Sequence, residues 1–504
     1  MIKLIYRIES DYMSKKRMLI VTSVTLSVVT ISLGIVKLYQ TYALSNYIGT
    51  VTDTGIDVYI NDDSYASIPA NGSSNVYYML TNTNPGTVKY GVAYQTTSGV
   101  TVKVYDTSED PATGTIEEND KKYIKLHLEN KNSTNKTIEL STVLGYENGG
   151  DLVVPSGVTL VTDTYTPPPT AAEYITKLYT TASKTTVTNN SITYNTAPSV
   201  SLMNDRLGGT TTDLDGGNIR YYGASPNNYI YFNCSDYSNQ TSSTCETWRI
   251  IGVFDGKLKL IRGSQIGTYS WDNKDTSTGA ESNFGKNDWT TARLMKLLNP
   301  SDYYTTDSND NNLGQGLYYN SASGKCYSGQ NNATVDCNFT STGIKNDITR
   351  NMIAETTYNL GGWNSNTVYP NLMYEKERGT TVYTGRPTTP WTGKIALAYT
   401  SDYGYAADLN QCKDKTLYDY NNSTCTSNNW MKAIITNNGS NSGWLLTPYS
   451  STSGTVWAVR SLGGVGYGYS AYYAIGAVPV LSLSSKLGIE SGDGSSSNPY
   501  KLSA

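Results

Sequence analysis

The sequence predicts an α+β protein in which an N-terminal membrane helix precedes a small antiparallel β-sandwich and a larger mixed domain. An uncharged run near the N-terminus is followed by short stretches of alternating apolar residues, and helical and strand-like patterns mix beyond a proline-rich linker. Every Trp and every Phe lies beyond that linker, so composition and pattern change together. The expected boundaries are 1–17 for a cytoplasmic tail, 18–40 for a membrane anchor or signal segment, 46–165 for the sandwich, 166–170 for the linker and 171–504 for the larger domain.

The segment 18–40 is expected to anchor the protein in a membrane. No charged residue interrupts Met18 to Val36, and as a helix this run would be about 28 Å long, close to the hydrocarbon thickness of a bilayer. Basic residues precede it, so the positive-inside rule places the N-terminus in the cytoplasm and the later domains outside the cell. A signal peptide cleaved near Thr41-Tyr42-Ala43 is the alternative, and the protein would then be secreted.

The next region reads as a β-sandwich of immunoglobulin-like architecture. Short alternating runs separated by turn formers fit about seven strands, although the disulfide and core Trp of immunoglobulin domains are missing. The only histidine of the chain, His127, lies in one of these runs and is assigned no role. The runs are GIDVYI, NVYYML, VKYGVAYQT, VTVKVY, YIKLHLE, TIELSTVL and GVTLVT.

The larger domain begins with a helical pattern and continues with the clearest hairpin of the chain. In AAEYITKLYTTA, the side chains of Ile175, Leu178 and Tyr179 fall on one helical face. Further on, the apolar runs WRIIGVF and KLKLIR flank Asp255-Gly256, a dipeptide suited to a two-residue β-turn.

Two more helices are expected before the chain returns to strands. Asn287 or Asp288 can cap a helix over WTTARLMKLL that ends before Asn299-Pro300. A second helix is expected near 344–358, with Ile344, Ile348 and Met352 on one face. Short strands follow in IALAYT, WLL, VWAVR and VPVLSL, which completes the α+β pattern.

The six cysteines form three close pairs in the sequence. Sequence alone permits many connectivities, but each neighbouring pair brackets a polar loop and none has the CxxC spacing of a zinc or redox site. We expect neighbour pairing and therefore an oxidising, extracytoplasmic location. The expected disulfides are Cys234 with Cys245, Cys326 with Cys337, and Cys412 with Cys425.

Composition and motifs argue against several classes of function. A net charge of -4 with 16% charged residues gives no case for nucleic acid as a partner. The larger domain has no histidine, which excludes Ser-His-Asp or Cys-His catalysis and histidine-based metal sites within it. The acidic loops 213–218 and 307–312 are interpreted as polar turns rather than calcium sites. We expect neither enzymatic activity nor a metal or cofactor, although a carboxylate-dependent glycosidase stays open as an alternative.

Tyrosine is the unusual residue of this chain, with 44 Tyr against 4 Phe. Five of them lie in the stretch from Trp444 to Leu483, among Gly and Ser, a composition that antibody binding loops use for adaptable contacts. The Trp residues of this stretch could instead pack in the core. The Tyr residues could instead be present because tyrosine favours β-strands. The predicted ligand-binding residues are Tyr449, Trp457, Arg460, Tyr467, Tyr469, Tyr472 and Tyr473.

Several runs between about Asn218 and Leu502 also point to a family. GGNIRYYGASPNNYIYFNC, WRIIGVF, the NDW helix, LLTP and VPVLSLSSKLGIESGDGSSSNPYKL together resemble a C-type-lectin-like domain of unknown function found in surface proteins of gut Firmicutes and their relatives. The resemblance implies a C-type-lectin-like fold, related distantly to formylglycine-generating enzymes and to variable proteins diversified by retroelements. In those variable proteins the ligand-binding residues lie in a segment that corresponds here to about 449–476.

The chain departs from relatives of this fold at two places. The family usually has Arg-Pro before its last strand, where this chain has Val478-Pro479. The Glu-Pro-Asn and Gln-Pro-Asp triplets of calcium-dependent lectins are missing, and Trp271-Asp272-Asn273 reverses their Trp-Asn-Asp. The resemblance therefore brings neither a calcium-dependent sugar site nor formylglycine chemistry.

These observations predict a bacterial cell-surface binding protein, adhesin-like, that recognises an extracellular protein or glycan ligand through its Tyr/Ser/Gly-rich C-terminal segment. A structural subunit of a surface layer or fibre is one alternative. A carboxylate-dependent glycan hydrolase is the other.

Overall fold

The computed structural model describes most of the chain beyond the predicted membrane segment. The predicted tail, 1–17, and the predicted anchor, 18–40, lie outside the described residues. Within the described part, no helix is both long and apolar enough to span a bilayer. The described ranges are 44–52, 55–59, 65–82, 86–145, 152, 154–273, 285–305, 313–330, 333–365, 367–383, 386–387, 390–413 and 415–503.

The chain divides into two compact units, Met1–Pro168 and Pro169–Ala504. The division falls inside the proline-rich segment 166–170, where a run of three prolines stiffens the backbone. Each unit has its own apolar core.

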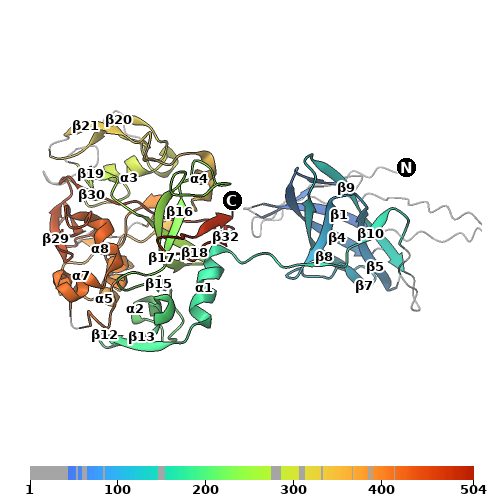
Figure 1. Cartoon of the computed structure of the whole chain (residues 1–504), viewed down its shortest axis with the longest axis horizontal. Coiled ribbons are helices and arrows are strands. Elements are labelled where there is room, and N and C mark those ends of the chain that lie inside the picture. Colours follow the sequence, from blue (N-terminus) through green and yellow to red (C-terminus); the bar gives the residue numbers. More distant parts are fainter. Residues whose placement is uncertain are drawn as a thin grey trace, which may run out of the picture. The chain divides into compact units, whose positions relative to one another are not determined.

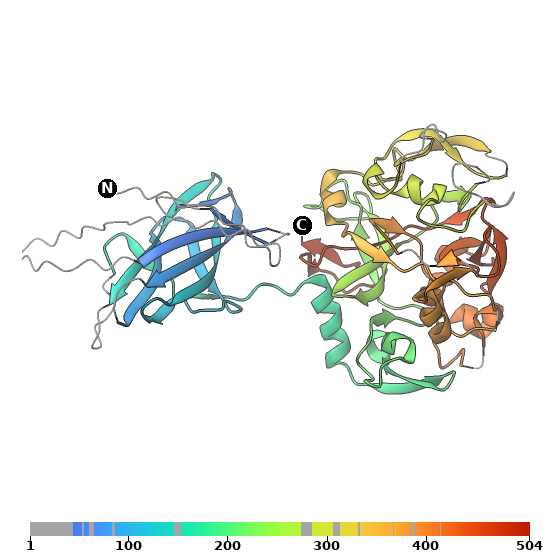
Figure 2. The same cartoon turned by 180° about the vertical axis from the view of Figure 1, so that it is seen from behind.

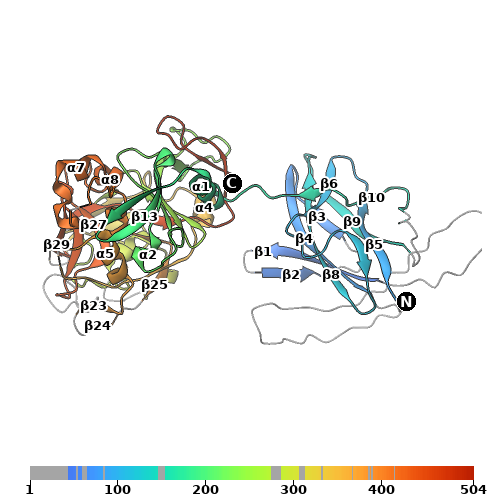
Figure 3. The same ribbon diagram turned by 90° about the horizontal axis from the view of Figure 1, so that it is seen from below.

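The described part of the first unit consists of strands in two sheets (Figures 1 and 3). One sheet has the order β11-β6-β8-β4-β1-β2 and the other the order β10-β5-β9-β3, with β7 added against β5. The strands are β1 (Leu44–Thr52), β2 (Gly55–Tyr59), β3 (Tyr65–Ile68), β4 (Gly72–Asn82), β5 (Val88–Gln95), β6 (Val100–Tyr105), β7 (Thr113–Ile116), β8 (Lys121–Asn130), β9 (Lys136–Gly145), β10 (Val158–Leu160) and β11 (Thr164–Tyr165).

Alternation explains why the two sheets pack on one core. Val76 and Leu80 of β4 and Leu126 of β8 point inward from one sheet, and Val92 of β5 points inward from the other. The seven expected strands are present, and β1, β3, β7 and β11 are additional. The expectation of a purely antiparallel sandwich is wrong at β11, which pairs with β6 in parallel.

The second unit is built around two larger sheets, and its strands outweigh its helices. The first sheet has the order β12-β13-β14-β15-β17-β18-β31-β26, with β16 against β17, and the second has the order β19-β30-β27-β28-β29. Their strands are β12 (Thr185–Asn189), β13 (Ile192–Ala197), β14 (Leu202–Asn204), β15 (Ile219–Tyr221), β16 (Tyr229–Phe232), β17 (Glu246–Phe254), β18 (Lys257–Arg262), β26 (Ile395–Ala396), β31 (Val480–Ser482), β19 (Gly267–Tyr269), β27 (Gly443–Pro448), β28 (Thr455–Val459), β29 (Val465–Ser470) and β30 (Ile475–Ala477).

Short helices and two-stranded ribbons surround these sheets. Figure 2 shows the dark-red C-terminal hairpin beside the green strands of the first sheet, where Tyr500 pairs with Ile230. The helices are α1 (Ala171–Thr181), α2 (Arg206–Gly209), α3 (Arg293–Leu298), α4 (Asp347–Met352), α5 (Pro370–Glu377), α6 (Thr400–Tyr405), α7 (Ser423–Ser427) and α8 (Trp430–Ile435), with 3-10 turns η1 (Pro198–Val200), η2 (Ser301–Tyr303) and η4 (Leu417–Asn421). The ribbons are β20 (Ser323–Tyr327) with β21 (Thr334–Asn338), β22 (Thr356–Tyr358) with β25 (Trp391–Gly393), β23 (Thr381–Tyr383) with β24 (Arg386–Pro387), and β32 (Gly488–Ser491) with β33 (Lys501–Ser503).

Locally encoded elements appear where the sequence predicts them. The helix α1 begins with a capping box, in which the Thr170 hydroxyl accepts from the Glu173 amide and the Glu173 carboxylate accepts from the Thr170 amide. The hairpin β17–β18 turns at Asp255 and Gly256, both with positive φ, as a type I′ turn requires. All three expected disulfides are confirmed: Cys234–Cys245, Cys326–Cys337 and Cys412–Cys425.

Three expected elements differ in extent. The helix expected over 289–298 starts only at Arg293, because Asp288 accepts from the Thr290 amide and hydroxyl and closes a local turn instead. The helix expected over 344–358 ends at Met352, and Ile348 is 56% exposed rather than on the buried face. In IALAYT only the first two residues form a strand, and Thr400 begins a helix.

The strand β28 lies between two apolar cores. Val456 and Ala458 belong to the larger core, whereas Trp457 and Val459, which alternate with them, belong to the smaller one. Burial on both faces explains why this strand reads as a continuous apolar run. The strand therefore forms a rigid base for the edge strand β29 that pairs with it.

Candidate ligand-binding surface

The predicted binding residues lie on β28 and β29 and in the segments that directly follow β27, β28 and β29. β29 is at the edge of its sheet, paired with β28 on one side only (Figure 1). Its residues Tyr467 and Tyr469 are separated by Gly468. In a regular strand, residues two apart point to the same face.

A β-bulge at Gly468 breaks this rule. Val456 pairs with Tyr469, but Ala458 pairs with Gly466, so β29 has one more residue than β28 across this interval. Gly468 has φ +78°, the left-handed conformation that a glycine bulge uses. Since the extra residue reverses the alternation, Tyr467 and Tyr469 lie on opposite faces of the sheet.

On one face, Tyr467 stacks on Tyr449 over a buried Trp457. The Tyr467 and Tyr449 ring centroids are 5.0 Å apart and nearly parallel, and the Trp457 ring lies 5.8 Å from Tyr467 and 5.9 Å from Tyr449. The ring of Tyr467 is 39% exposed, and Tyr449 is half-buried. Trp457 has no solvent exposure, so its prediction as a ligand-contacting residue is corrected: its ring supports the two tyrosines from below.

A fourth aromatic residue, Trp363, adjoins this group. Its carbonyl accepts from the Trp457 indole N–H at 3.1 Å and from the Ser450 amide, and its backbone pairs with Tyr449. The Lys376 ammonium lies 4.8 Å from the centroid of its half-buried ring. We call Tyr449, Trp457, Tyr467 and Trp363 the Tyr467 platform.

On the opposite face, Tyr469, Tyr472 and Tyr473 form a second group. The Tyr469 ring lies 6.3 Å from the buried Trp444 and 6.4 Å from Tyr473, and its hydroxyl is 3.2 Å from that of Ser442. Tyr473 is 41% exposed, and a hydrogen bond with Tyr472 raises the pKa of its phenol. Tyr472 is buried, with its carbonyl accepting from Ser270, and its ring lies 4.8 Å from that of the exposed Tyr473.

Arg460 lies on the same face as Tyr469. A Cβ at Gly466 would lie 2.5 Å from Arg460 Nε and 3.1 Å from the Tyr469 ring, so both side chains cover this glycine. The Arg460 guanidinium is 4.8 Å from the ring of Tyr418, an exposed residue of η4. Among the described residues Arg460 forms no ion pair. We call Arg460, Tyr418, Tyr469, Tyr472 and Tyr473 the Tyr469 face.

Neither group offers a constellation for acid–base or metal chemistry. Across the described ranges, no three His, Cys, Asp or Glu side chains lie close enough together to hold a metal ion. In the first acidic loop, the Asp213 carboxylate accepts a hydrogen bond from the Asp215 amide, and the Asp215 carboxylate accepts one from the Tyr179 hydroxyl. The second acidic loop, 307–312, lies outside the described residues. Asp272 is fully buried and accepts backbone N–H groups. What the two faces do offer is aromatic area with polar tips, which suits reversible binding.

Sequence reasoning missed Trp363 and Tyr418. Both are distant in sequence from the predicted stretch, and long-range pairing brings them to it. Comparison with protein-family models and with curated proteins yields no match. The proposal that this surface binds a ligand therefore depends on the geometry of the surface itself.

Proposed function

We propose that this protein is a membrane-anchored, outward-facing binding protein, adhesin-like, and that the Tyr467 platform contacts a protein or glycan ligand. The observation that carries the proposal is Tyr467, which is exposed on a bulged edge strand, stacks on the half-buried Tyr449 and is backed by a fully buried Trp. In this proposal the second unit has a C-type-lectin-like fold and the first is an immunoglobulin-like spacer.

The physical argument is pre-organisation. A solvent-exposed aromatic ring on a mobile loop loses rotamer freedom when it binds, and that loss weakens affinity. Tyr467 is held between its stacking partner and Trp457 before any ligand arrives. Its ring can therefore be covered at little entropic cost, as in binding loops that use tyrosine for this purpose.

The disulfides indicate the compartment in which the protein would meet its ligand. Three disulfides, each closing a local loop, favour an oxidising compartment. Binding without a reaction is proposed because the second unit contains no histidine and its two aromatic groups include no carboxylate.

The test compares two matched single substitutions in the full-length protein. Tyr467 and Tyr473 have nearly equal exposure, 39% and 41%, but lie in the two different groups. We expect Tyr467→Ala to weaken binding to glycan arrays and to intact cell surfaces by at least about tenfold, with Tyr473→Ala close to wild type. Melting curves of both variants would show whether the fold is intact. Unchanged binding by folded Tyr467→Ala would refute the assignment of the platform.

A further inference from the structure

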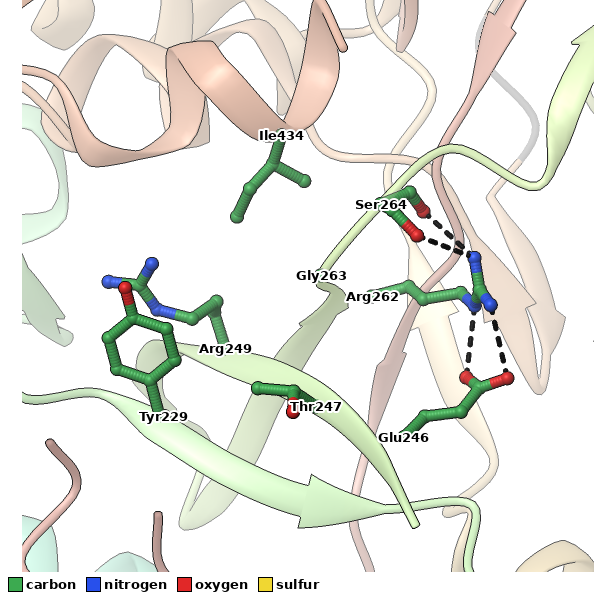
Figure 4. A pocket seen from close by; sticks show the side chains of 8 residues that line it. All are labelled: Tyr229, Glu246, Thr247, Arg249, Arg262, Gly263, Ser264 and Ile434. Atoms are coloured by element: carbon green, nitrogen blue, oxygen red, sulfur yellow. Dashed lines mark hydrogen bonds and ion pairs between the residues drawn. The ribbon is translucent and has the colours of Figure 1, made fainter. Parts of the chain in front are cut away.

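A cleft of about 420 Å³ lies on the second unit, beside β16, β17 and β18 (Figure 4). Trp248 and Ile250 point from β17 into the larger core, and Arg249 between them points to the cleft. No residue of the Tyr467 platform or the Tyr469 face lines it. The lining residues are Tyr229, Glu246, Thr247, Arg249, Arg262, Gly263, Ser264 and Ile434.

Arg249 is a buried cation held only by neutral groups. It is 7% exposed, and its guanidinium lies 3.6 Å from the centroid of Tyr229 and 4.9 Å from that of Trp430. Its Nε donates to Asn228 Oδ1, and its Nη2 donates to the Pro226 carbonyl at 3.3 Å. Among the described residues no carboxylate pairs with it, and burial lowers its pKa to about 10, so it stays charged at neutral pH.

The other charged residues of the cleft neutralise each other. Arg262 and Glu246 form a bidentate pair, with Nε to Oε2 at 2.9 Å and Nη2 to Oε1 at 3.1 Å (Figure 4). The remaining Arg262 donors point to the Ser264 hydroxyl and carbonyl and to the Gln265 carbonyl. Glu246 also accepts from the Trp248 indole. The lining therefore carries one unbalanced positive charge, that of Arg249.

The lining residues also include hydrogen-bond donors without protein partners. Within the described residues, Arg249 Nη1, the Tyr229 hydroxyl and the Thr247 hydroxyl have no hydrogen-bond partner. Tyr229 and Arg249 are directly paired across β16 and β17, so strand pairing fixes their mutual position. The Asn228 side chain, which is buried and donates to the Ile250 carbonyl, orients the guanidinium.

We propose that this cleft binds the singly charged oxyanion group of a small polar ligand, a carboxylate or a sulfate ester, such as an acidic sugar carries. One unbalanced positive charge matches one negative charge, and a planar guanidinium with free donors matches an oxyanion. The volume falls within the range of small-molecule sites, roughly 300 to 1,000 Å³. The Tyr229 ring and Ile434 supply apolar walls for the rest of the ligand. This site is independent of the Tyr467 platform.

The experiment titrates the full-length protein with three small probes. Glucuronate carries a carboxylate, glucose 6-sulfate a sulfate ester, and glucose is the neutral control of similar size. Calorimetry should show saturable binding of at least one anionic probe and none of glucose, with affinity falling as sodium chloride increases. The two anionic arms show which oxyanion the cleft prefers.

Two variants locate the site. Arg249→Met removes the charge but keeps the length of the side chain, and it should weaken binding of the anionic probe roughly ten- to hundredfold. Thr247→Trp fills the cleft from an exposed position and leaves Arg249 itself unsubstituted, so it stays informative if the first variant does not fold. Thr188→Trp, at an exposed threonine of β12 outside the cleft, is the matched control and should bind as wild type does.

The proposal is overturned if neither anionic probe binds up to millimolar concentration. It is also overturned if glucose binds equally well, or if anion binding persists in Thr247→Trp. Because the tyrosine substitutions leave this cleft unchanged, failure here does not bear on the proposed function of the Tyr467 platform.

Discussion

Arg220 and Asp402 form a fully buried ion pair, with Nη1 and Oδ1 2.7 Å apart, although 182 residues separate them in the sequence. Each is 1% exposed. Arg220 also pairs with Asp205 and Asp402 with Lys259, so the network joins β15, β18 and α6 at the centre of the second unit. Guanidinium stacking on Phe254 and Tyr405 completes the enclosure of Arg220.

Breaking this network should destabilise the second unit strongly. Arg220→Met leaves Asp205 buried without its ion-pair partner and Asp402 with Lys259 alone, and breaking comparable buried pairs costs about 3 to 5 kcal/mol. Every Trp lies in the second unit, so denaturant unfolding followed by Trp fluorescence reports that unit alone.

Lys325→Met is the matched control, because Lys325 pairs with Asp336 at the surface, where the two side chains are 52% and 88% exposed. Its effect should stay below about 1 kcal/mol. Equal effects of the two substitutions would contradict the structural role of the network.

The same network predicts acid sensitivity at low pH. Burial alone would raise the pKa of Asp402, but Lys259 and Arg220 outweigh it and lower that pKa from 3.8 to about 2. Protonation therefore favours the unfolded chain, and the stability contributed by this carboxylate, about 2 kcal/mol, is present above pH 4 and lost as the pH falls through 3.8 towards 2. Urea unfolding at stepped pH, compared between wild type and Asp402→Asn, should show this slope only in wild type.

Local signals account for what the sequence predicted. Asp255-Gly256 fixes a hairpin turn, Thr170 and Glu173 cap a helix, and closely spaced cysteines meet because the chain between them is short. In each case the residues that decide the structure lie within a few positions of one another. The C-type-lectin-like fold and the membrane anchor stay predictions.

Long-range effects account for what it did not predict. The sequence showed a single tyrosine cluster, but strand register across the Gly468 bulge divides it between two faces. Periodicity placed Ile348 on one face with Ile344 and Met352, whereas helix α4 starts after Ile344, at Asp347, and buries Thr349 and Met352 instead of Ile348. The cleft around Arg249 is lined from β16, β17, β18 and α8, so no local pattern could indicate it.

The single histidine gives a clean test of the first unit. His127 is buried, contacts Asn75 across the strands at 2.7 Å and stacks on Tyr165 at 3.6 Å. Burial lowers its pKa below 6.5, and Glu129 opposes that shift. The stability linked to its neutral form is therefore present above pH 6.5 and lost as the pH falls through the lowered value.

Because the chain has only one imidazole, an NMR titration should give one curve with a midpoint below 6.5. Glu129→Gln should move the midpoint lower still, since it removes the opposing charge. A midpoint at or above 6.5 in the folded wild type would show that the ring is not buried as described.

The backbone conformation of Gly468 sets the position of Tyr467, on which the proposed binding function depends. A Cβ at this position would meet no atom within 4 Å, so steric crowding is not the reason for glycine here. The reason is the φ of +78°, which residues with a Cβ rarely adopt. Gly468→Val should cost about 1 to 2 kcal/mol by backbone strain, or shift the register of β29 and move Tyr467 from its place on Tyr449. Gly468→Asn is the matched control, since Asn tolerates the left-handed region. We expect ligand binding and unfolding free energy to fall in the order wild type, Asn, Val; if both variants equal wild type, the bulge does not hold the platform in place.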